Sequence, residues 1–552
     1  MRPDLSDDSP AALRRGALSR SPVRPWIRSV GCTLAVLAAC SACAPAEAKD
    51  AASPAGAPPP ELLVSVALGP VTTLRNLQAY VEAIKPGAGA SLSDQVVRRG
   101  LADAVGASSL DGLDPTSGLY LLIADTGGSP GIALLGKVSD ARKLEASAGK
   151  DRLVARGGWA VIGPRPLIDR VAPYGIAAIA PQPAPRAPTA TVYVPHLLAR
   201  YKTEIEAART KMTADLSKMS PGGASKLLTA YVDGLWSLAS DTERVVVSLE
   251  AAPDLASLDI ALVPRAGSRL AAFTQLQRAS NFALLGRLPQ TTPTVLLGGH
   301  LELGPFHDAM VSAIASLYIP EAPQDLIAAF DLLRKVMTGE IATTMQFGLK
   351  TGMEFTQIYT VTDARAADKA FVTMLDMFKA GRKIDMQTVS FTLKASPSTT
   401  SHGGVTLRSY DTAFDLSKLP PEQHQAMASM MPEGTQHVYL GAFDDLAVLV
   451  SAKDGAAEVR RTIDAARGKG AHFAAGKLVD PLLAASRARK DSLVMAMDLG
   501  GLMGSFTGKS LGTQPIVMAF GAADRNAHLR FSVPAATARA LASLGSMNGG
   551  QP

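Results

Sequence analysis

The side chains best suited to metal chemistry lie in one short segment of the second half of the chain. His424, Met427 and Met431 are spaced by three and then four residues, directly after a proline. On a helix this spacing places all three side chains on one face, and imidazole with thioethers is a ligand set suited to Cu(I). The competing interpretation is that the methionines fill an irregular helix–sheet core. Because nothing else in the chain indicates copper handling, we prefer the core interpretation and expect no metal and no cofactor.

A second segment has part of the spacing of a phosphate-binding loop. It reads Gly504-Ser-Phe-Thr-Gly508-Lys509-Ser510. Such a loop needs four residues between its glycines, so that backbone amides surround the phosphates, and a helix directly after it. Here three residues separate the glycines, and Pro515 with an apolar run follows. We therefore predict a turn at this position and no nucleotide chemistry.

The remaining histidines and carboxylate pairs do not form a catalytic pattern. His300 and His307 are too far apart to share a helical face, and helix capping or surface roles are expected for them. The acidic pair Asp444 and Asp445, like the pair at 204 and 206, has no neighbour that would raise one pKa above the other. No catalytic residue is predicted, and a hydrolase with widely scattered residues is kept as an alternative.

The cysteines and the charge exclude several classes of function. All three cysteines lie within the first 43 residues, which excludes structural disulfides, zinc–thiolate sites and thiol nucleophiles from the rest of the chain. Residues 1–39 carry six arginines and three aspartates, so their removal lowers the net charge from +6 to +3. No block of basic residues with interleaved aromatics is present, and a nucleic-acid partner is not expected.

One cysteine completes the run Leu37-Ala38-Ala39-Cys40, which follows an arginine-rich segment and about ten apolar residues. Ten residues are too few to span ~30 Å of hydrocarbon, so the segment is typical of a signal peptide. The run resembles the lipobox of bacterial lipoproteins. That resemblance implies removal of residues 1–39 and lipidation of Cys40, which would anchor the chain to a membrane of the cell envelope. Ser41 in place of aspartate implies the outer membrane, at its periplasmic face or at the cell surface.

A second cleavage pattern leaves an alternative open. Residues 46–48 read Ala-Glu-Ala, the small-residue pattern that an ordinary signal peptidase recognises. Cleavage there would release a soluble periplasmic protein that begins at Lys49. The pattern lies farther from the apolar run than such sites usually do, so we prefer the lipidated form.

The rest of the chain divides into a tether and two related halves. Residues 40–60 are rich in alanine and proline and are predicted to be a flexible tether. The same order of strand and helix units recurs afterwards, with Val138-Ser-Asp-Ala-Arg142 matching Val361-Thr-Asp-Ala-Arg365. Such repetition indicates an ancestral duplication. We predict a first lobe over 61–290, with a proline-rich break at 181–188, a second lobe over 291–546, and a tail over 547–552.

The predicted fold class is α+β. The strands alternate apolar and polar residues, which is typical of antiparallel sheet. The helices carry one apolar stripe each, and we expect two tandem lobes of antiparallel sheet with amphipathic helices packed on one face. Asp140 and Asp363 are predicted N-caps. An inserted strand pair is expected near 387–414, with an exposed loop at 395–404.

These observations favour a non-catalytic binding or scaffolding role in the cell envelope. The expected partners are the membrane, through the lipid anchor, and an envelope protein or apolar ligand. One alternative is a carrier of an apolar ligand or lipid between the two lobes, because clefts between domains are common ligand sites. An apolar cavity would favour this carrier, whereas a buried cluster of histidine, carboxylate and serine would favour the hydrolase.

Overall fold

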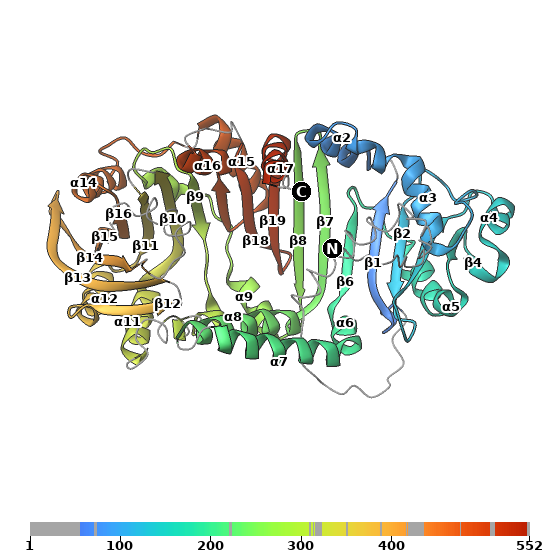
Figure 1. The fold of residues 1–552 in the computed structure, drawn as a ribbon, viewed down its shortest axis with the longest axis horizontal. Helices are drawn as coiled ribbons and strands as arrows, with labels where there is room; N and C mark the ends of the chain where they lie inside the picture. Colours follow the sequence, from blue (N-terminus) through green and yellow to red (C-terminus); the bar gives the residue numbers. More distant parts are fainter. Residues whose placement is uncertain are drawn as a thin grey trace, which may run out of the picture.

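One continuous sheet runs the length of the molecule, with helices lying along both ends of its strands (Figure 1). The computed structural model describes residues 56–70, 74–219, 223–308, 311, 312, 314, 323–348, 352–386, 389–415, 417, 435–474, 476–507 and 514–548. All strand pairs in the sheet are antiparallel, and the described chain therefore has the α+β class that its sequence predicts.

The first half of the chain supplies one end of the 19-stranded sheet. From the outer edge inward, the strands are β4 (Leu153–Arg156), β5 (Trp159–Ile162), β3 (Gly131–Lys137), β2 (Leu119–Ala124), β1 (Leu62–Gly69), β6 (Thr189–Tyr193), β7 (Thr242–Ala252) and β8 (Leu255–Pro264).

The second half continues the sheet from β8 outward. Its strands are β19 (Asn526–Pro534), β18 (Ile516–Ala523), β17 (Leu493–Met497), β9 (Val295–His300), β10 (Met337–Gly348), β11 (Gly352–Val361), β16 (Leu446–Ser451), β15 (Thr435–Phe443), β14 (Val405–Asp415), β13 (Val389–His402) and β12 (Arg382–Met386).

The two halves repeat one topology, and this confirms the predicted duplication. The order β5-β3-β2-β1-β6-β7-β8 in the first lobe matches the order β16-β11-β10-β9-β17-β18-β19 in the second. Val138 directly follows β3 and Val361 ends β11, so the two motif valines occupy equivalent places. Strands β12, β13 and β14 are an addition to the second lobe.

The helix that follows each motif begins in the same way. Asp140 precedes α4 (Ala141–Ala148) with φ −145° and ψ 101°, and Asp363 precedes α12 (Ala364–Met377) with φ −144° and ψ 101°. Each carboxylate accepts hydrogen bonds from backbone amides in the first turn of its helix. Both aspartates are therefore N-caps, as predicted.

The lobes join through equivalent strands, because β8 pairs with β19. Val263-Pro264 ends β8 as Val533-Pro534 ends β19, and this alignment makes Ser257 equivalent to Ala527 and Leu262 equivalent to Ser532. The pairing is reciprocal under the same alignment, since Ser257 faces Ser532 and Leu262 faces Ala527. The junction thus has the self-complementary form of a twofold interface within a single chain.

Helices cover both faces of the outer strands, which is broader coverage than the single face expected from the sequence. In the first lobe, α5 (Arg165–Tyr174) packs on the face that contains Leu135. Helices α3 (Asp94–Val105) and α4 pack on the opposite face, which contains Leu134. Neighbouring strand residues point to opposite faces, so the full burial of both leucines requires two layers of helices.

The second lobe is layered in the same way. Its helices on the outer strands are α12, α11 (Pro323–Val336), α14 (Gly455–Ala466) and α15 (Gly476–Arg489). Val448 belongs to the core beneath α14 and α15, and its neighbour Ala447 belongs to the core beneath α11 and α12. The segment from Phe282 to Leu288 also packs into the first of these cores, so the chain enters the second lobe before residue 290.

The strands on either side of the junction are less covered. The nearby helices are α2 (Leu74–Ile84), α17 (Ala535–Asn548), α6 (Val194–Arg200), α7 (Lys202–Met219), α8 (Gly223–Ser240), α9 (Arg269–Leu276) and the short 3-10 helix η6 (Gly304–Phe306). Figure 1 shows α2 and α17 across the upper ends of the central strands and α7, α8 and α9 across their lower ends. The middle of these strands lies between the two groups of helices.

Two further expectations concern loops and membrane spans. The proline-rich segment 181–188 is irregular and precedes β6, as predicted. The predicted loop at 395–404 is wrong, because residues up to His402 pair with β14 and only Gly403 and Gly404, both with positive φ, form the turn.

Among the described helices, none is long and apolar enough to cross a membrane.

Candidate functional sites

The residues singled out by motif lie largely outside the described chain. Cys40, the possible copper ligands His424, Met427 and Met431, and Lys509 all fall outside the described residues. Gly504 belongs to α16 (Leu499–Thr507), so a helix precedes the glycine-rich segment. A phosphate-binding loop has its helix on the other side.

The two histidines near residue 300 have separate surroundings. His307 is buried, and its Nδ1 lies 3.0 Å from Oδ1 of Asp308, whose side chain is 87% exposed. Asp331 brings a third possible metal-ligand atom to the same place, all within 4.8 Å of one another. The hydrogen bond from His307 holds the pKa of Asp308 below its usual range. Only Asp308 of this pair is exposed. The surface role expected for the two histidines is wrong, because His307 is 8% exposed and His300, in β9, is 3% exposed.

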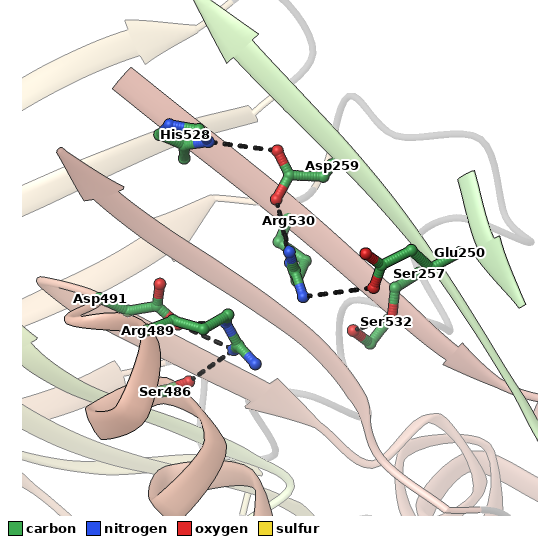
Figure 2. Close-up of polar contacts among 9 residues, drawn as sticks. All are labelled: Glu250, Ser257, Asp259, Ser486, Arg489, Asp491, His528, Arg530 and Ser532. Atoms are coloured by element: carbon green, nitrogen blue, oxygen red, sulfur yellow. Dashed lines mark hydrogen bonds and ion pairs between the residues drawn. The ribbon is translucent and has the colours of Figure 1, made fainter. Parts of the chain in front are cut away.

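A group of polar side chains crosses the lobe junction on one face of the sheet (Figure 2). Asp259 on β8 lies opposite Arg530 on β19, and its carboxylate accepts hydrogen bonds from Arg530 at 2.9 Å and from His528 at 3.2 Å. We call the following residues the polar seam: Glu250, Ser257, Asp259, His528, Arg530 and Ser532. Further contacts in it are an ion pair of 3.8 Å from Arg530 to Glu250 and a 2.8 Å hydrogen bond between the two serine hydroxyls.

The charges of the polar seam satisfy one another. Burial raises the pKa of Asp259, but hydrogen bonds from His528 and Arg530 and the positive charge of Arg530 outweigh it, so the net pKa lies below its usual range. The ionised carboxylate is therefore the stable form at neutral pH. The nearby ion pair of Arg489 with Asp491, which also includes a hydrogen bond to Ser486, is engaged in the same way (Figure 2).

The polar seam contains histidine, carboxylate and serine, but they do not have the spatial arrangement of a catalytic triad. In a catalytic triad the serine and the carboxylate bond to opposite nitrogens of one imidazole. Here His528 and Ser532 are four residues apart on one strand, which corresponds to about 13 Å. Arg530 and Asp259 lie between them. The hydrogen-bond pattern of the polar seam is therefore that of a structural ion-pair network.

A second cluster of the same residue types lies beside β9. Ser280 donates a hydrogen bond to Glu340 at 3.3 Å and accepts one from the amide of Phe282 at 3.0 Å. Nδ1 of His300, which is 3% exposed, lies 3.9 Å from the same carboxylate. The imidazole packs against Gly339, where an added Cβ would lie 2.6 Å from the ring. Because the serine bonds to the carboxylate and not to the imidazole, His300 is in no position to accept its proton.

The face opposite the polar seam is apolar. Strand alternation places aliphatic and aromatic side chains of β7, β8, β19 and β18 side by side there. We call the following residues the apolar floor: Val245, Val247, Leu249, Leu258, Ile260, Leu262, Met518, Phe520, Leu529 and Phe531. Every one of them is partly exposed.

Helix pairs related by the duplication border the apolar floor at both ends. At one end Tyr80 of α2 donates a hydrogen bond to the carbonyl of Val533 at 3.0 Å, and Arg539 of α17 donates one to the carbonyl of Ala83 at 2.8 Å. At the other end Phe273 of α9 packs against Phe520, with ring centroids 5.8 Å apart. These helices therefore flank the apolar floor at the two ends of its strands.

A polar pocket of about 250 Å³ lies within the second lobe. Its floor includes Thr344 of β10 and Thr356 of β11, which face each other in the sheet. Its rim includes Glu458 and Arg461 from the first turns of α14, and these two side chains form an ion pair. Burial raises the pKa of Glu458, and the positive charge of Arg461 only partly offsets that effect.

The sequence analysis did not identify either the polar seam or the polar pocket. Asp259 and Arg530 are 271 residues apart and meet only because β8 pairs with β19. For Glu458 a local signal exists, because it lies on the same helical stripe as the buried Thr462. A buried acidic residue on the apolar stripe of a helix indicates a local polar environment.

Comparison of this chain with protein-family models, with curated proteins and with solved structures gives no match.

Proposed function

We propose that this protein is an envelope lipoprotein, anchored through Cys40, whose folded body binds an apolar ligand without catalysis. The observation that carries the proposal is the apolar floor, which spans the lobe junction and stays partly exposed along four adjacent strands. Soluble monomers seldom expose large contiguous apolar patches, and those that do commonly use them for binding.

The composition of the apolar floor favours a hydrocarbon chain over a peptide. None of its side chains carries a hydrogen-bonding group. The strands beneath it are paired on both edges, so no free backbone edge is present there for an added strand. Removing hydrocarbon from water stabilises a complex by about 25 cal/mol per Å² of apolar surface. An acyl chain lying across the floor would gain this contribution and needs no polar partner.

The expected anchor agrees with such a role. A lipid on Cys40 and the tether over 40–60 would hold the body close to a membrane, where acyl chains are abundant. The polar seam supports a non-catalytic function, because Asp259, His528 and Arg530 are bonded to one another. Their function is to join the lobes, and the ligand-binding role falls to the opposite face.

A fluorescent fatty acid titrated into the mature chain tests the proposal. We expect saturable binding that unlabelled fatty acid displaces. Val247→Asn adds a polar group to the apolar floor and should weaken binding about tenfold or more, since an unpaired amide buried against hydrocarbon is costly. Val246→Asn is the matched control. It makes the same change one residue earlier on β7, on the opposite face, and should leave the affinity unchanged.

Equal effects of the two substitutions, or no saturable binding, would contradict the proposed ligand. The anchor is tested separately by the intact mass of the mature protein. A lipid-modified N-terminus at Cys40 is expected. An unmodified chain that begins at Lys49 would replace the lipoprotein with a soluble periplasmic protein.

A further inference from the structure

The polar pocket of the second lobe contains hydroxyl groups that the protein leaves without a partner. Thr344 is 4% exposed and Ser451 is 3% exposed, and both line the pocket. Neither hydroxyl forms a hydrogen bond with a described residue, and neither oxygen is among the fully buried unpaired atoms, so both oxygens are open to the pocket. A hydroxyl that is open to a pocket and has no protein partner bonds to water or to a ligand. These two groups can donate and accept hydrogen bonds at the surface of the pocket.

The other polar groups of the pocket are arranged around one carboxylate. Thr356 donates a hydrogen bond to Oε1 of Glu458 at 3.2 Å, and Arg461 contacts the other oxygen. Each carboxylate oxygen accepts more than one hydrogen bond. Glu458 can therefore accept further bonds from ligand hydroxyls while it keeps both protein partners.

The charge and size of the pocket narrow the class of ligand. Two acids, Glu354 and Glu458, and one base, Arg461, line it, so an anion is disfavoured. Its volume of about 250 Å³ is below the range of about 300–1,000 Å³ typical of drug-sized ligands. A hydrocarbon would leave the hydroxyls unpaired. The complementary ligand is small and uncharged and carries several hydroxyl groups.

The duplication provides an internal comparison that excludes a purely structural need for these polar residues. The equivalent place in the first lobe is where Ala133 and Leu122 face each other beneath Ile168, the fourth residue of α5 after Pro164. Glu458 is likewise the fourth residue after the N-cap Asp454. The three first-lobe residues are apolar and fully buried. The same layer of the fold thus forms without a polar pocket.

From these observations we propose that the pocket between Thr344, Ser451 and Glu458 binds a neutral, polyhydroxylated ligand of monosaccharide size. The ligand hydroxyls would donate to Glu458 and exchange hydrogen bonds with Thr344 and Ser451. This site is separate from the apolar floor, and the proposal does not depend on the function proposed there.

Calorimetric titration of the mature chain with D-glucose, glycerol and glucose 6-phosphate tests the class of ligand. Saturable, millimolar binding of glucose is expected, with weaker binding of glycerol because it offers fewer hydroxyls. The phosphate ester should bind more weakly than glucose, since its charge is repelled by Glu354 and Glu458. Tighter binding of the phosphate ester, or no binding of glucose, would overturn the proposal.

Adjacent threonines on β10 supply a matched pair of variants. Thr343 and Thr344 are both buried, and neither hydroxyl bonds to a described residue. The Thr343 oxygen is fully buried, whereas Thr344 lines the pocket. Thr344→Val should weaken glucose binding about tenfold, the equivalent of one lost hydrogen bond. Thr343→Val should leave it unchanged. Ser451→Ala provides a second lining variant if Thr344→Val does not fold, and circular dichroism checks each variant.

The glucose titrations of these variants and of Val247→Asn distinguish binding in the polar pocket from binding at the apolar floor. Equal affinities of the Thr343→Val and Thr344→Val proteins, or wild-type affinity in the Ser451→Ala protein, would refute the assignment of the site. Val247→Asn should leave glucose binding intact, because the apolar floor lies on other strands. Loss of glucose binding in that variant would also contradict the proposed location.

Discussion

The two lobes share one topology but fill the same position in opposite ways. Beneath the helix that follows the β-hairpin, the first lobe packs Leu122, Ala133 and Ile168, all fully buried. The second lobe has Thr344, Thr356 and Glu458 in the equivalent places. The backbone arrangement therefore tolerates either an apolar core or a polar pocket at this layer.

This difference between the lobes shows that the fold does not require polar residues at this position but can contain them. The apolar version stabilises the first lobe by dispersion and by removal of surface from water. The polar version carries a carboxyl whose pKa is raised by burial, and the hydroxyls of Thr344 and Ser451 bond to no described residue. A polar arrangement of this kind weakens stability and is available for a ligand.

The lobe junction shows a third arrangement, in which polar groups are used by the fold itself. The pKa of Asp259 is lowered where that of Glu458 is raised, although both carboxyls are largely buried. The cause lies in their partners, since Asp259 accepts from both Arg530 and His528. Substitutions at Ile168, Asp259 and Glu458 should therefore change the free energy of unfolding by amounts that differ in sign and size.

The largest effect is expected where a charge enters the apolar version of the position. Ile168→Glu places a carboxylate in an apolar cluster of the first lobe, and should lower the free energy of unfolding by about 4 kcal/mol or more. Urea denaturation at pH 7 measures the change. Ile168→Val is the control, with a loss of about 1 kcal/mol. A loss for Ile168→Glu no larger than that of the control would show that the two lobes are not packed differently here.

An intermediate effect is expected at the polar seam. Asp259→Asn leaves the partly buried Arg530 without its main counter-charge and should destabilise the fold by about 2 kcal/mol at pH 7, less than for a fully buried pair. The lowered pKa of Asp259 means that its contribution is present above the unfolded-state pKa of about 4 and is lost as the pH falls through the folded-state pKa. The wild-type advantage should therefore shrink in acid.

The exposed ion pair of Asp444 with Arg467 supplies the control for this variant. Asp444→Asn should cost less than about 1 kcal/mol. Asn also tolerates the positive φ of 52° at that position. Equal losses for the two variants would show that the polar seam is only a surface contact and does not hold the lobes together.

The smallest effect has the opposite sign. Glu458→Gln removes a carboxylate whose pKa is raised and should increase the free energy of unfolding at pH 7 by about 1 kcal/mol. The stability that wild-type Glu458 provides is present below the unfolded-state pKa of about 4.3 and is lost as the pH rises through the folded-state pKa. The advantage of the variant should therefore vanish near pH 4. Thermal unfolding of the variant and the wild type at both pH values measures this difference. If Glu458→Gln destabilised the protein at pH 7, the Glu458 carboxylate would stabilise the fold, as that of Asp259 does, and the expectation would be wrong.

Local patterns predicted much of the fold. The repeated motifs at Val138 and Val361 were recognisable because strand alternation and helix capping depend on neighbouring residues. The sequence did not predict that helices cover both faces of the outer strands. Runs such as Leu134-Leu135 are buried on both sides, and a short apolar run does not reveal which helices will cover it. The loop expected at 395–404 was wrong because serine and threonine, common in turns, also extend β13 up to His402.

The candidate sites depended far more on the folded chain. Asp259 and Arg530, or Thr344 and Glu458, come from distant segments, and no local spacing relates them. The motif-based candidates at His424 and Lys509 lie outside the described residues, so they stay predictions. The anchor at Cys40 is a prediction of the same kind.

The sequence by itself determined the α+β class, the duplication, and the helix starts at Asp140 and Asp363, because each of these follows from periodicity and capping over a few neighbouring residues. Only the tertiary structure decided which side chains meet. Pairing β8 with β19 brought opposite charges together on one face and left an apolar floor on the other. The first turns of α14 brought Glu458 and Arg461 to the pocket that Thr344 of β10 and Thr356 of β11 also line. Such contacts arise from the register and layering of strands far apart in the chain, which local sequence does not encode.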